Sequence, residues 1–129
     1  MKRPFQILFL LFILTSCSER FNVIDPTKFN KKIAQRADIS TPKELIKIFY
    51  NHPKSERMPK LTLNSRKIDK ELIEITLIHD NLKDDSQRAT KIIMIATLKN
   101  KKWAVIEIKT NWKCWNGRGH TNWSTDLCI

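Results

Sequence analysis

Four runs of alternating apolar and polar residues constrain the fold of this chain more than any other feature. They cover residues 60–66, 72–79, 89–98 and 103–112 and are rich in isoleucine, leucine and threonine. A period of two indicates β-strands, because successive side chains of a strand point to opposite faces of a sheet. Residues 99–102 form a short polar turn, so we expect the last two runs to pair as an antiparallel hairpin.

Helical signals precede these strands. Thr41 and Glu44 have the spacing of a capping box, with a proline at the first helical position between them, and predict a helix over residues 42–51. An Asp-Pro start and apolar residues near helical spacing predict a shorter helix over residues 26–36. Helices followed by an antiparallel meander indicate an α+β fold, with one or two N-terminal helices packed on a four-stranded antiparallel sheet.

This order of elements resembles the NTF2-like superfamily, and within it the small lumazine-binding-like secreted lipoproteins of unknown function. The resemblance covers residues 40–112 and rests on the pattern of elements, which cystatin-like folds share. Some NTF2-like enzymes use an Asp with a Tyr or His inside the cone of the fold. Here Glu74 and Glu107 lie at positions expected to face outward, and Tyr50 lies at the end of a helix. No catalytic residue is therefore assigned.

The first sixteen residues have the parts of an export signal. A positive start at Lys2 and Arg3 precedes an apolar run over residues 5–14, and small residues follow it. The run is too short to span a bilayer of ~30 Å. We therefore expect residues 1–16 to direct export and to be removed, although an uncleaved N-terminal anchor is an alternative.

Residues 14–17 read Leu-Thr-Ser-Cys and resemble the lipobox of bacterial lipoproteins. The resemblance implies a diacylglyceryl group on Cys17 and stable anchoring by two or three acyl chains. Residues 17–24 would form the lipid-anchored tether of a single domain over residues 25–129. Ser18, in place of an Asp, resembles an outer-membrane address that faces the periplasm. The alternative is an ordinary signal peptide with a chance cysteine.

The other two cysteines, Cys114 and Cys128, predict a disulfide, because paired cysteines in an exported chain are usually oxidised. The alternative is a zinc site that adds His120 to the two thiolates. The spacing matches no paired C-x-x-C pattern and a fourth ligand is not evident. We therefore predict no metal and no cofactor.

All four tryptophans and both glycines lie from residue 103 onward, and the two glycines flank Arg118. In a chain so poor in glycine, this placement predicts a positive φ on either side of Arg118. The tail resembles a signature of small bacterial secreted proteins, in which Gly-Arg-Gly-His lies between two cysteines. Those proteins also carry an Asp-Asp-Ser loop before the penultimate strand, matched here by residues 84–86. They have no established activity, so the resemblance implies a fold and no mechanism.

Two interpretations of this tail stay open. As a recognition loop, it would bind a carboxylate or phosphate through Arg118, stack Trp115 or Trp123 on a ligand, and use His120 to titrate or donate a hydrogen bond. As a structural clasp, pinned by the disulfide, it would pair Arg118 with Asp84 or Asp85 and cover a sheet end with the tryptophans. We favour the clasp, because Arg–carboxylate pairs commonly order loops.

The chain is strongly basic, with 24 Lys and Arg residues against 13 Asp and Glu residues. Such a balance is typical of proteins with anionic partners. The lysines are spread without a run of five like charges, which favours compositional drift and predicts no specific nucleic-acid site. We expect a non-enzymatic binding or structural module, with an envelope protein as partner. The alternatives are binding to an anionic envelope polymer, a small-molecule enzyme, and a homodimer through residues 91–95, which are apolar on both faces.

Overall fold

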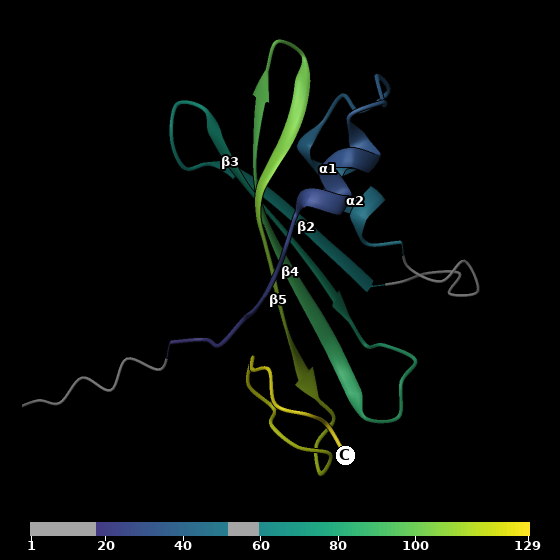
Figure 1. Cartoon of the computed structure of the whole chain (residues 1–129). Helices are drawn as coiled ribbons and strands as arrows, with labels where there is room; N and C mark the ends of the chain where they lie inside the picture. The colour runs from purple at the N-terminus through teal and green to yellow at the C-terminus, as the bar shows by residue number, and fades with distance from the viewer. Residues whose placement is uncertain (1–17, 52–59) are drawn as a thin grey trace, which may run out of the picture.

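The computed structural model describes residues 18–51 and 60–129. In this part of the chain, two helices lie against an open five-stranded antiparallel sheet of order β1-β5-β4-β3-β2 (Figure 1). The elements are β1 (Asn22–Ile24), α1 (Thr27–Ile33), α2 (Pro42–Phe49), β2 (Lys60–Lys67), β3 (Leu72–Asp80), β4 (Gln87–Lys99) and β5 (Lys102–Cys114). The α+β class and both helices are confirmed. The predicted signal and Cys17 lie outside the described residues.

The prediction of four strands missed β1. This strand comes from the predicted tether and pairs antiparallel with β5, with Asn22 opposite Thr110 and Ile24 opposite Ile108. Three residues are too few to show an alternating pattern. The expectation that residues 17–24 form only a tether is therefore wrong for the part that enters the sheet.

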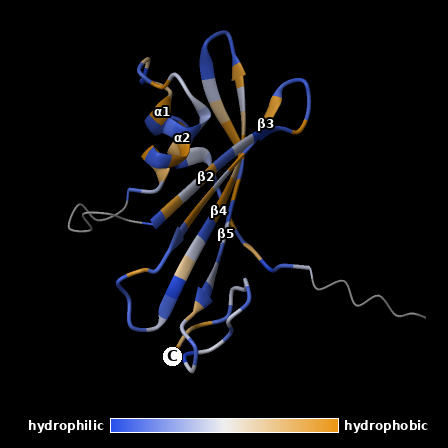
Figure 2. Ribbon diagram, turned by 180° about the vertical axis from the view of Figure 1, so that it is seen from behind, coloured by the Kyte–Doolittle hydropathy of each residue, from blue (hydrophilic) through white to orange (hydrophobic). Residues whose placement is uncertain are grey.

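The core fills the layer between the helices and one face of the sheet. Leu45 and Ile46 of α2 have no exposed surface. Beneath them lie buried residues of the three central strands, Ile75, Leu77, Ile92, Met94 and Ile108. Figure 2 shows hydrophobic positions along the strands where they cross in the middle of the sheet. Within the described residues, no helix has both the length and the apolar character needed to cross a membrane.

The predicted capping box at the start of α2 is confirmed. The hydroxyl of Thr41 accepts a hydrogen bond from the backbone N–H of Glu44 at 3.3 Å, and the Glu44 carboxylate accepts one from the backbone N–H of Thr41 at 3.0 Å. The hydrogen bonds that the Glu44 carboxylate accepts from the backbone N–H of Ser40, the backbone N–H of Thr41 and the hydroxyl of Ser40 lower its pKa. The box fixes the register in which the apolar side of α2 meets the sheet.

Replacing Thr41 by alanine is expected to lower the free energy of unfolding by about 1 kcal/mol, because one N-cap hydrogen bond is lost. Urea denaturation followed by far-UV circular dichroism measures the change. Thr121→Ala, at an exposed position near the other end of the chain, is the matched control and should change stability by less than about 0.5 kcal/mol. Equal effects of the two substitutions would contradict a specific role for the cap.

The predicted hairpin joins β4 to β5. Lys99 lies opposite Lys102, and the two residues between them, Asn100 and Lys101, have φ angles of 52° and 62°. Two consecutive positive φ angles are typical of the two-residue turn whose twist matches that of paired strands. Figure 1 shows this hairpin at one end of the sheet.

A β-bulge changes which residues of β5 face the core. Ile95 lies opposite Glu107 but Ala96 lies opposite Val105, so Ile106 is the extra residue of the bulge. Simple alternation predicts Ile106 on the core face, and this is wrong. Ile106 is 54% exposed, while Val105 is 3% exposed and takes the core position.

Candidate functional site

Residues 114–129 form a compact unit beyond the end of β5, which we call the clasp (Figure 1). The predicted disulfide joins Cys114 to Cys128 across a sequence separation of 14 residues. A second link lies just before it, where Trp112 and Ser124 exchange two backbone hydrogen bonds of 3.0 Å. The clasp is therefore held both covalently and through the end of β5.

Both glycines of the clasp have the predicted positive φ, +80° at Gly117 and +137° at Gly119. The backbone N–H of Arg118, between them, donates to the carbonyl of Trp115 at 2.9 Å and closes a tight turn. A Cβ on Gly119 would lie 2.9 Å from Cys114 Sγ. Glycine is thus required at position 119 by both backbone conformation and space.

The expected ion pair of Arg118 with Asp84 or Asp85 is not formed. Arg118 is exposed, and its Nη1 lies 3.5 Å from the carbonyl oxygen of Ile129, whose N–H donates to the Arg118 carbonyl at 2.7 Å. The Asp84 carboxylate instead accepts hydrogen bonds from the backbone N–H groups of Gln87 and Ser86, which lower its pKa. Asp84 therefore orders its own loop.

Trp115 makes the link that was expected of Arg118. Its indole N–H donates to the Asp84 carbonyl at 2.8 Å, and its backbone N–H donates to the Ser86 carbonyl at 2.9 Å. The guanidinium of Arg88 also lies over its ring, 5.8 Å from the centroid. The clasp and the loop before β4 are thus joined as the clasp interpretation requires, through a different residue.

His120 is fully engaged inside the clasp. Its Nδ1 lies 2.8 Å from the Asn122 carbonyl oxygen, and its Nε2 lies 2.9 Å from that of Asp126. Its ligand atom lies within 4.8 Å of the sulfurs of Cys114 and Cys128. Zinc binds cysteine as the thiolate, and the disulfide leaves neither sulfur in that form. In this oxidised state the trio is a structural contact.

The residues before β1 are bound to the sheet, which the sequence did not indicate. The Glu19 carboxylate accepts hydrogen bonds from Lys91 Nζ at 2.6 Å and from Asn111 Nδ2 at 3.3 Å. Lys91 is only 8% exposed. Burial raises the pKa of Glu19, but the bonds from Lys91 and Asn111 outweigh it, so the pKa lies below its ordinary value. We call residues 19–24 the docked segment.

Arg20 connects the docked segment to the clasp. Its guanidinium donates to Ser124 Oγ at 3.0 Å and to the Asp126 carboxylate at 2.5 Å. Its backbone carbonyl accepts a bond of 3.0 Å from Asn111, a fully buried residue of β5. The segment is therefore held by β4, β5 and the clasp together.

Two ammonium groups lie close to the ring of Trp123. Lys91 Nζ is 4.3 Å and Lys113 Nζ is 4.6 Å from the centre of its ring. Lys109 Nζ likewise lies 5.2 Å from the centre of the Phe21 ring. Cation–π contacts of this kind contribute roughly 0.5–2 kcal/mol each. The Trp123 ring, proposed as a platform for a ligand, is thus already used to join the clasp to the sheet.

Replacing Glu19 by glutamine is expected to lower the free energy of unfolding by about 1–2 kcal/mol, because Lys91 would keep a buried charge without its partner. This expected loss of stability is smaller than the usual cost of breaking a buried ion pair, because the Glu19 side chain is 41% exposed. The matched control is the Glu19→Gln/Lys91→Met double variant, in which the charge is gone. It should recover most of the loss in urea denaturation, and no recovery would contradict the assigned pair.

The contribution of Glu19 is expected to depend on pH. Its pKa is lowered in the folded protein from an ordinary value of 4.5. The stabilisation is therefore present above about pH 4.5 and is lost as the pH falls through the lowered pKa. The difference in unfolding free energy between wild type and Glu19→Gln should shrink below pH 4.5. A difference that stays constant down to pH 2.5 would contradict this assignment.

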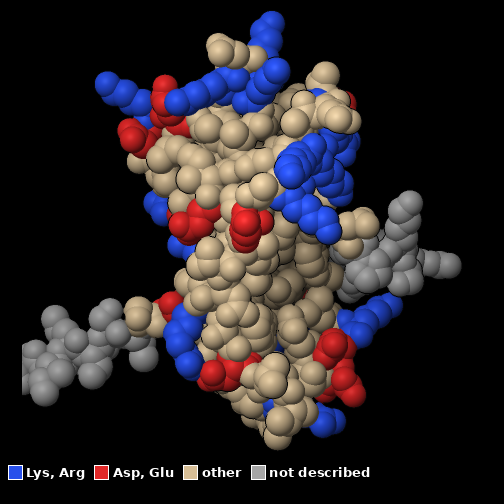
Figure 3. All heavy atoms as spheres, in the orientation of Figure 1, with Lys and Arg blue, Asp and Glu red and all other residues tan. Residues whose placement is uncertain are grey.

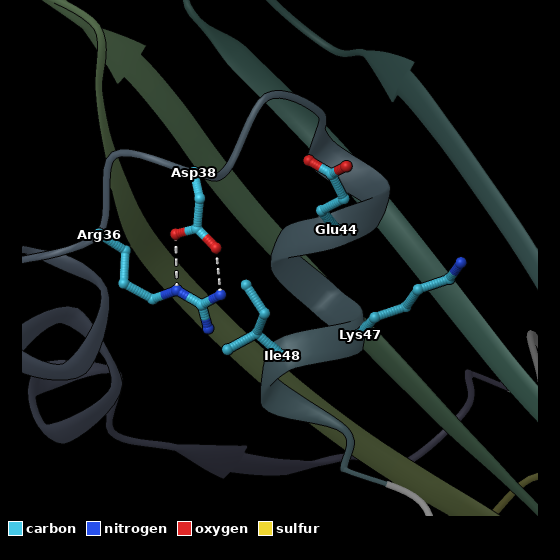
Figure 4. Close-up of a pocket in the computed structure, with 5 residues that line it drawn as sticks. All are labelled: Arg36, Asp38, Glu44, Lys47 and Ile48. Carbon is cyan, nitrogen blue, oxygen red and sulfur yellow. Dashed lines mark hydrogen bonds and ion pairs between the residues drawn. The ribbon is translucent and has the colours of Figure 1, made fainter.

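The pocket in Figure 4 is lined by Arg36, Asp38, Glu44, Lys47 and Ile48 and has a volume of about 290 Å³. Arg36 binds Asp38 through two hydrogen bonds of 2.9 and 2.5 Å and lowers the pKa of that carboxyl to about 2. Glu44 is engaged in the capping box, and the Lys47 side chain points away from the ion pair. The polar groups of this pocket mainly satisfy one another, so it does not indicate a ligand.

His79, near the end of β3, is fully buried. Its Nδ1 lies 2.8 Å from the hydroxyl of Tyr50, and the two rings meet edge to face. The sequence carried a signal for this, because Ile75, Leu77 and His79 are alternate residues and share one face of β3. The pair closes one end of the core below α2.

Comparison with known proteins gives no match among family models, curated proteins or solved structures. The assignment of a site therefore rests on the contacts within this chain. Those contacts single out the clasp, the docked segment and the Lys91–Glu19 pair as the most elaborate arrangement of polar and aromatic groups in the described residues.

Proposed function

We propose that this chain is an exported bacterial lipoprotein whose α+β domain is a non-enzymatic binding or structural module. The observation that carries the proposal is the Cys114–Cys128 disulfide. Disulfides persist in oxidising compartments outside the cytosol. This bond uses two of the three cysteines and leaves Cys17, which ends the Leu-Thr-Ser-Cys pattern. Lipid on Cys17 would then hold the domain on a membrane.

Further features support the finer parts of the proposal. Ser18 favours an outer-membrane address with the domain facing the periplasm. Two helices against an open antiparallel sheet are compatible with an NTF2-like or cystatin-like fold. The sheet face opposite the helices carries Ile93 and Ile95, both partly exposed, and offers a surface for an envelope protein or for a second copy of the chain.

Mass spectrometry of the native protein tests the anchor. The mature chain should begin at Cys17, carry a thioether-linked diacylglyceryl group there, and contain an intact disulfide. A Cys17→Ala variant is the control, because it should lose the lipid and leave the membrane fraction while keeping the disulfide. An unlipidated wild-type N-terminus with reduced Cys114 and Cys128 would contradict the proposal.

Binding of an anionic envelope polymer is the alternative that the structure favours next. Lys91, Lys109 and Lys113 lie beside Phe21 and Trp123, a mixture of charge and aromatic rings that suits such a ligand. However, Glu19 neutralises Lys91, and Figure 3 shows basic side chains at several separate places on the face that it draws. Affinity for lipopolysaccharide or teichoic acid should fall steeply with salt if phosphates are bound. A flat salt response would exclude this alternative.

An enzyme of the cone type would need a hollow beneath the helices. Leu45, Ile46, Ile75, Leu77 and Met94 fill that layer and have no exposed surface. A hollow of about 500 Å³ beside α1 is lined by Ile24, Phe29 and Phe49, with Lys28, Lys32 and Asp25 also lining it. Its lining is mainly apolar, which suits binding better than catalysis and supports the non-enzymatic proposal.

A further inference from the structure

The most exposed large apolar side chains gather on two neighbouring segments. Leu127 is 86% exposed, Ile129 78% and Val23 75%, whereas the next most exposed, Ile106, reaches 54%. Leu127 and Ile129 belong to the clasp at this end of the molecule, and Val23 lies farther along the sheet, opposite Lys109 of β5. Apolar side chains left in water at one end of a molecule indicate a contact with another apolar phase.

The docked segment brings the proposed lipid anchor to the same end. Glu19 is fixed by Lys91 and Asn111, and Arg20 by Ser124 and Asp126 of the clasp. Only Ser18 separates Glu19 from Cys17, so the two Cα atoms on either side of it are at most about 7 Å apart. Lipid on Cys17 would therefore hold the clasp close to the bilayer surface.

The charges of this end also suit a phospholipid surface. The acids beside the anchor are neutralised within the chain, Glu19 by Lys91 and Asp126 by Arg20. Arg118 is exposed and forms no ion pair with an acidic side chain of the described residues, so its guanidinium can reach phosphate groups, whereas the Lys113 ammonium lies over the Trp123 ring. Long basic side chains can lay their stems along an apolar layer and keep the charge in the headgroup region.

We propose that the clasp is a second membrane contact, which lies against phospholipid headgroups beside the lipid anchor. Leu127 and Ile129 enter the interface, while Arg118 contacts phosphates. The long axis of β5 then points away from the bilayer, with the β4–β5 hairpin at the far end (Figure 1). This inference rests on the proposed lipidation of Cys17 and adds an orientation to it.

The four tryptophans provide the test. Trp112, Trp115 and Trp123 lie in the clasp or at its start, and Trp103 lies at the hairpin end of β5. Trp103 and Trp112 are separated by roughly 30 Å along an extended strand. The full chain, exported and purified in lipidated form with 5-fluorotryptophan, is placed in nanodiscs of neutral and anionic phospholipid that contain a gadolinium-chelating lipid. Fluorine NMR then reports the broadening of each tryptophan.

We expect the Trp112, Trp115 and Trp123 resonances to broaden at least about tenfold more than Trp103, because paramagnetic broadening falls with the sixth power of distance and the span is ~30 Å. Leu127→Ser/Ile129→Ser should reduce this contrast several-fold. The matched control, Leu98→Ser/Ile106→Ser, removes two exposed apolar residues elsewhere on the sheet and should keep it. Retention of the Cys114–Cys128 bond, checked by mass, shows that the clasp is intact in both variants.

The outcomes separate the two proposals. Equal broadening of all four tryptophans in disc-bound protein, or the greatest broadening at Trp103, would overturn the orientation and leave the lipid anchor standing. If the clasp tryptophans broaden even in discs without the gadolinium lipid, the broadening comes from contacts between copies of the chain. This result would assign the apolar end to a protein contact and overturn the membrane contact. Protein that stays out of the disc fraction would overturn the anchor and this inference with it.

Discussion

Replacing Cys114 and Cys128 together by alanine is expected to lower the free energy of unfolding by roughly 3 kcal/mol. The disulfide closes a loop of about 15 residues, and its loss returns chain entropy to the unfolded state. Domains of this size have a total stability of only about 5–15 kcal/mol. Urea denaturation followed by far-UV circular dichroism measures the loss for the whole domain, and tryptophan fluorescence reports on the clasp.

Reduced wild-type protein is the matched control, because it loses the covalent link and keeps both side chains. It should lie within about 1 kcal/mol of the double alanine variant. A further loss in the variant would report the packing of Cys114, which is 1% exposed. If fluorescence changes at lower urea than circular dichroism, the clasp opens before the sheet. Unchanged stability after reduction would contradict a stabilising role for the bond.

The elements that local pattern controls were predictable. The capping box before α2 and the two-residue periodicity of β2 to β5 are properties of short stretches, and each strand lies within two residues of its expected bounds. The disulfide followed from counting cysteines. Both positive φ angles followed from the placement of the only glycines in the chain beside Arg118.

The features that depend on distant contacts were not predictable. Glu19 binds Lys91, which is 72 residues away in the sequence, and no local pattern marks either residue. Asn111 is polar and yet fully buried, because the docked segment covers it. The exposure of Ile106 depends on a bulge, which adds one residue and shifts the alternation of the strand.

The tail is an ordered unit, as the clasp interpretation predicts, but its contacts differ from those expected. The clasp interpretation expected Arg118 to join the tail to the loop before β4, because arginine is the residue best suited to pair with the carboxylate of Asp84 or Asp85. In the structure the glycines turn Arg118 towards Ile129, and the adjacent Trp115 reaches the Asp84 loop. Composition indicated that the segment was unusual, while the direction of each side chain depended on the folded backbone.

Replacing Gly119 by alanine is expected to destabilise the protein by about 3 kcal/mol. Its φ of +137° lies in a region that side chains other than glycine rarely adopt, which costs of order 1–3 kcal/mol. The new Cβ would also lie 2.9 Å from Cys114 Sγ, and relieving that contact adds roughly 1–3 kcal/mol of overpacking. The clash falls on the disulfide itself, so the clasp should lose its packing before the sheet does.

Gly117→Ala is the matched control, because it isolates the backbone effect. Gly117 has a φ of +80°, and a Cβ there would meet nothing within 4 Å. Only the conformational cost remains, about 1–2 kcal/mol. The difference between the two variants in urea denaturation therefore measures the contact between position 119 and the disulfide. Reduction of the disulfide should narrow the difference in stability between the two variants, because free thiols can move apart. Equal losses of stability for Gly119→Ala and Gly117→Ala in the oxidised protein would contradict a steric contact between position 119 and the disulfide.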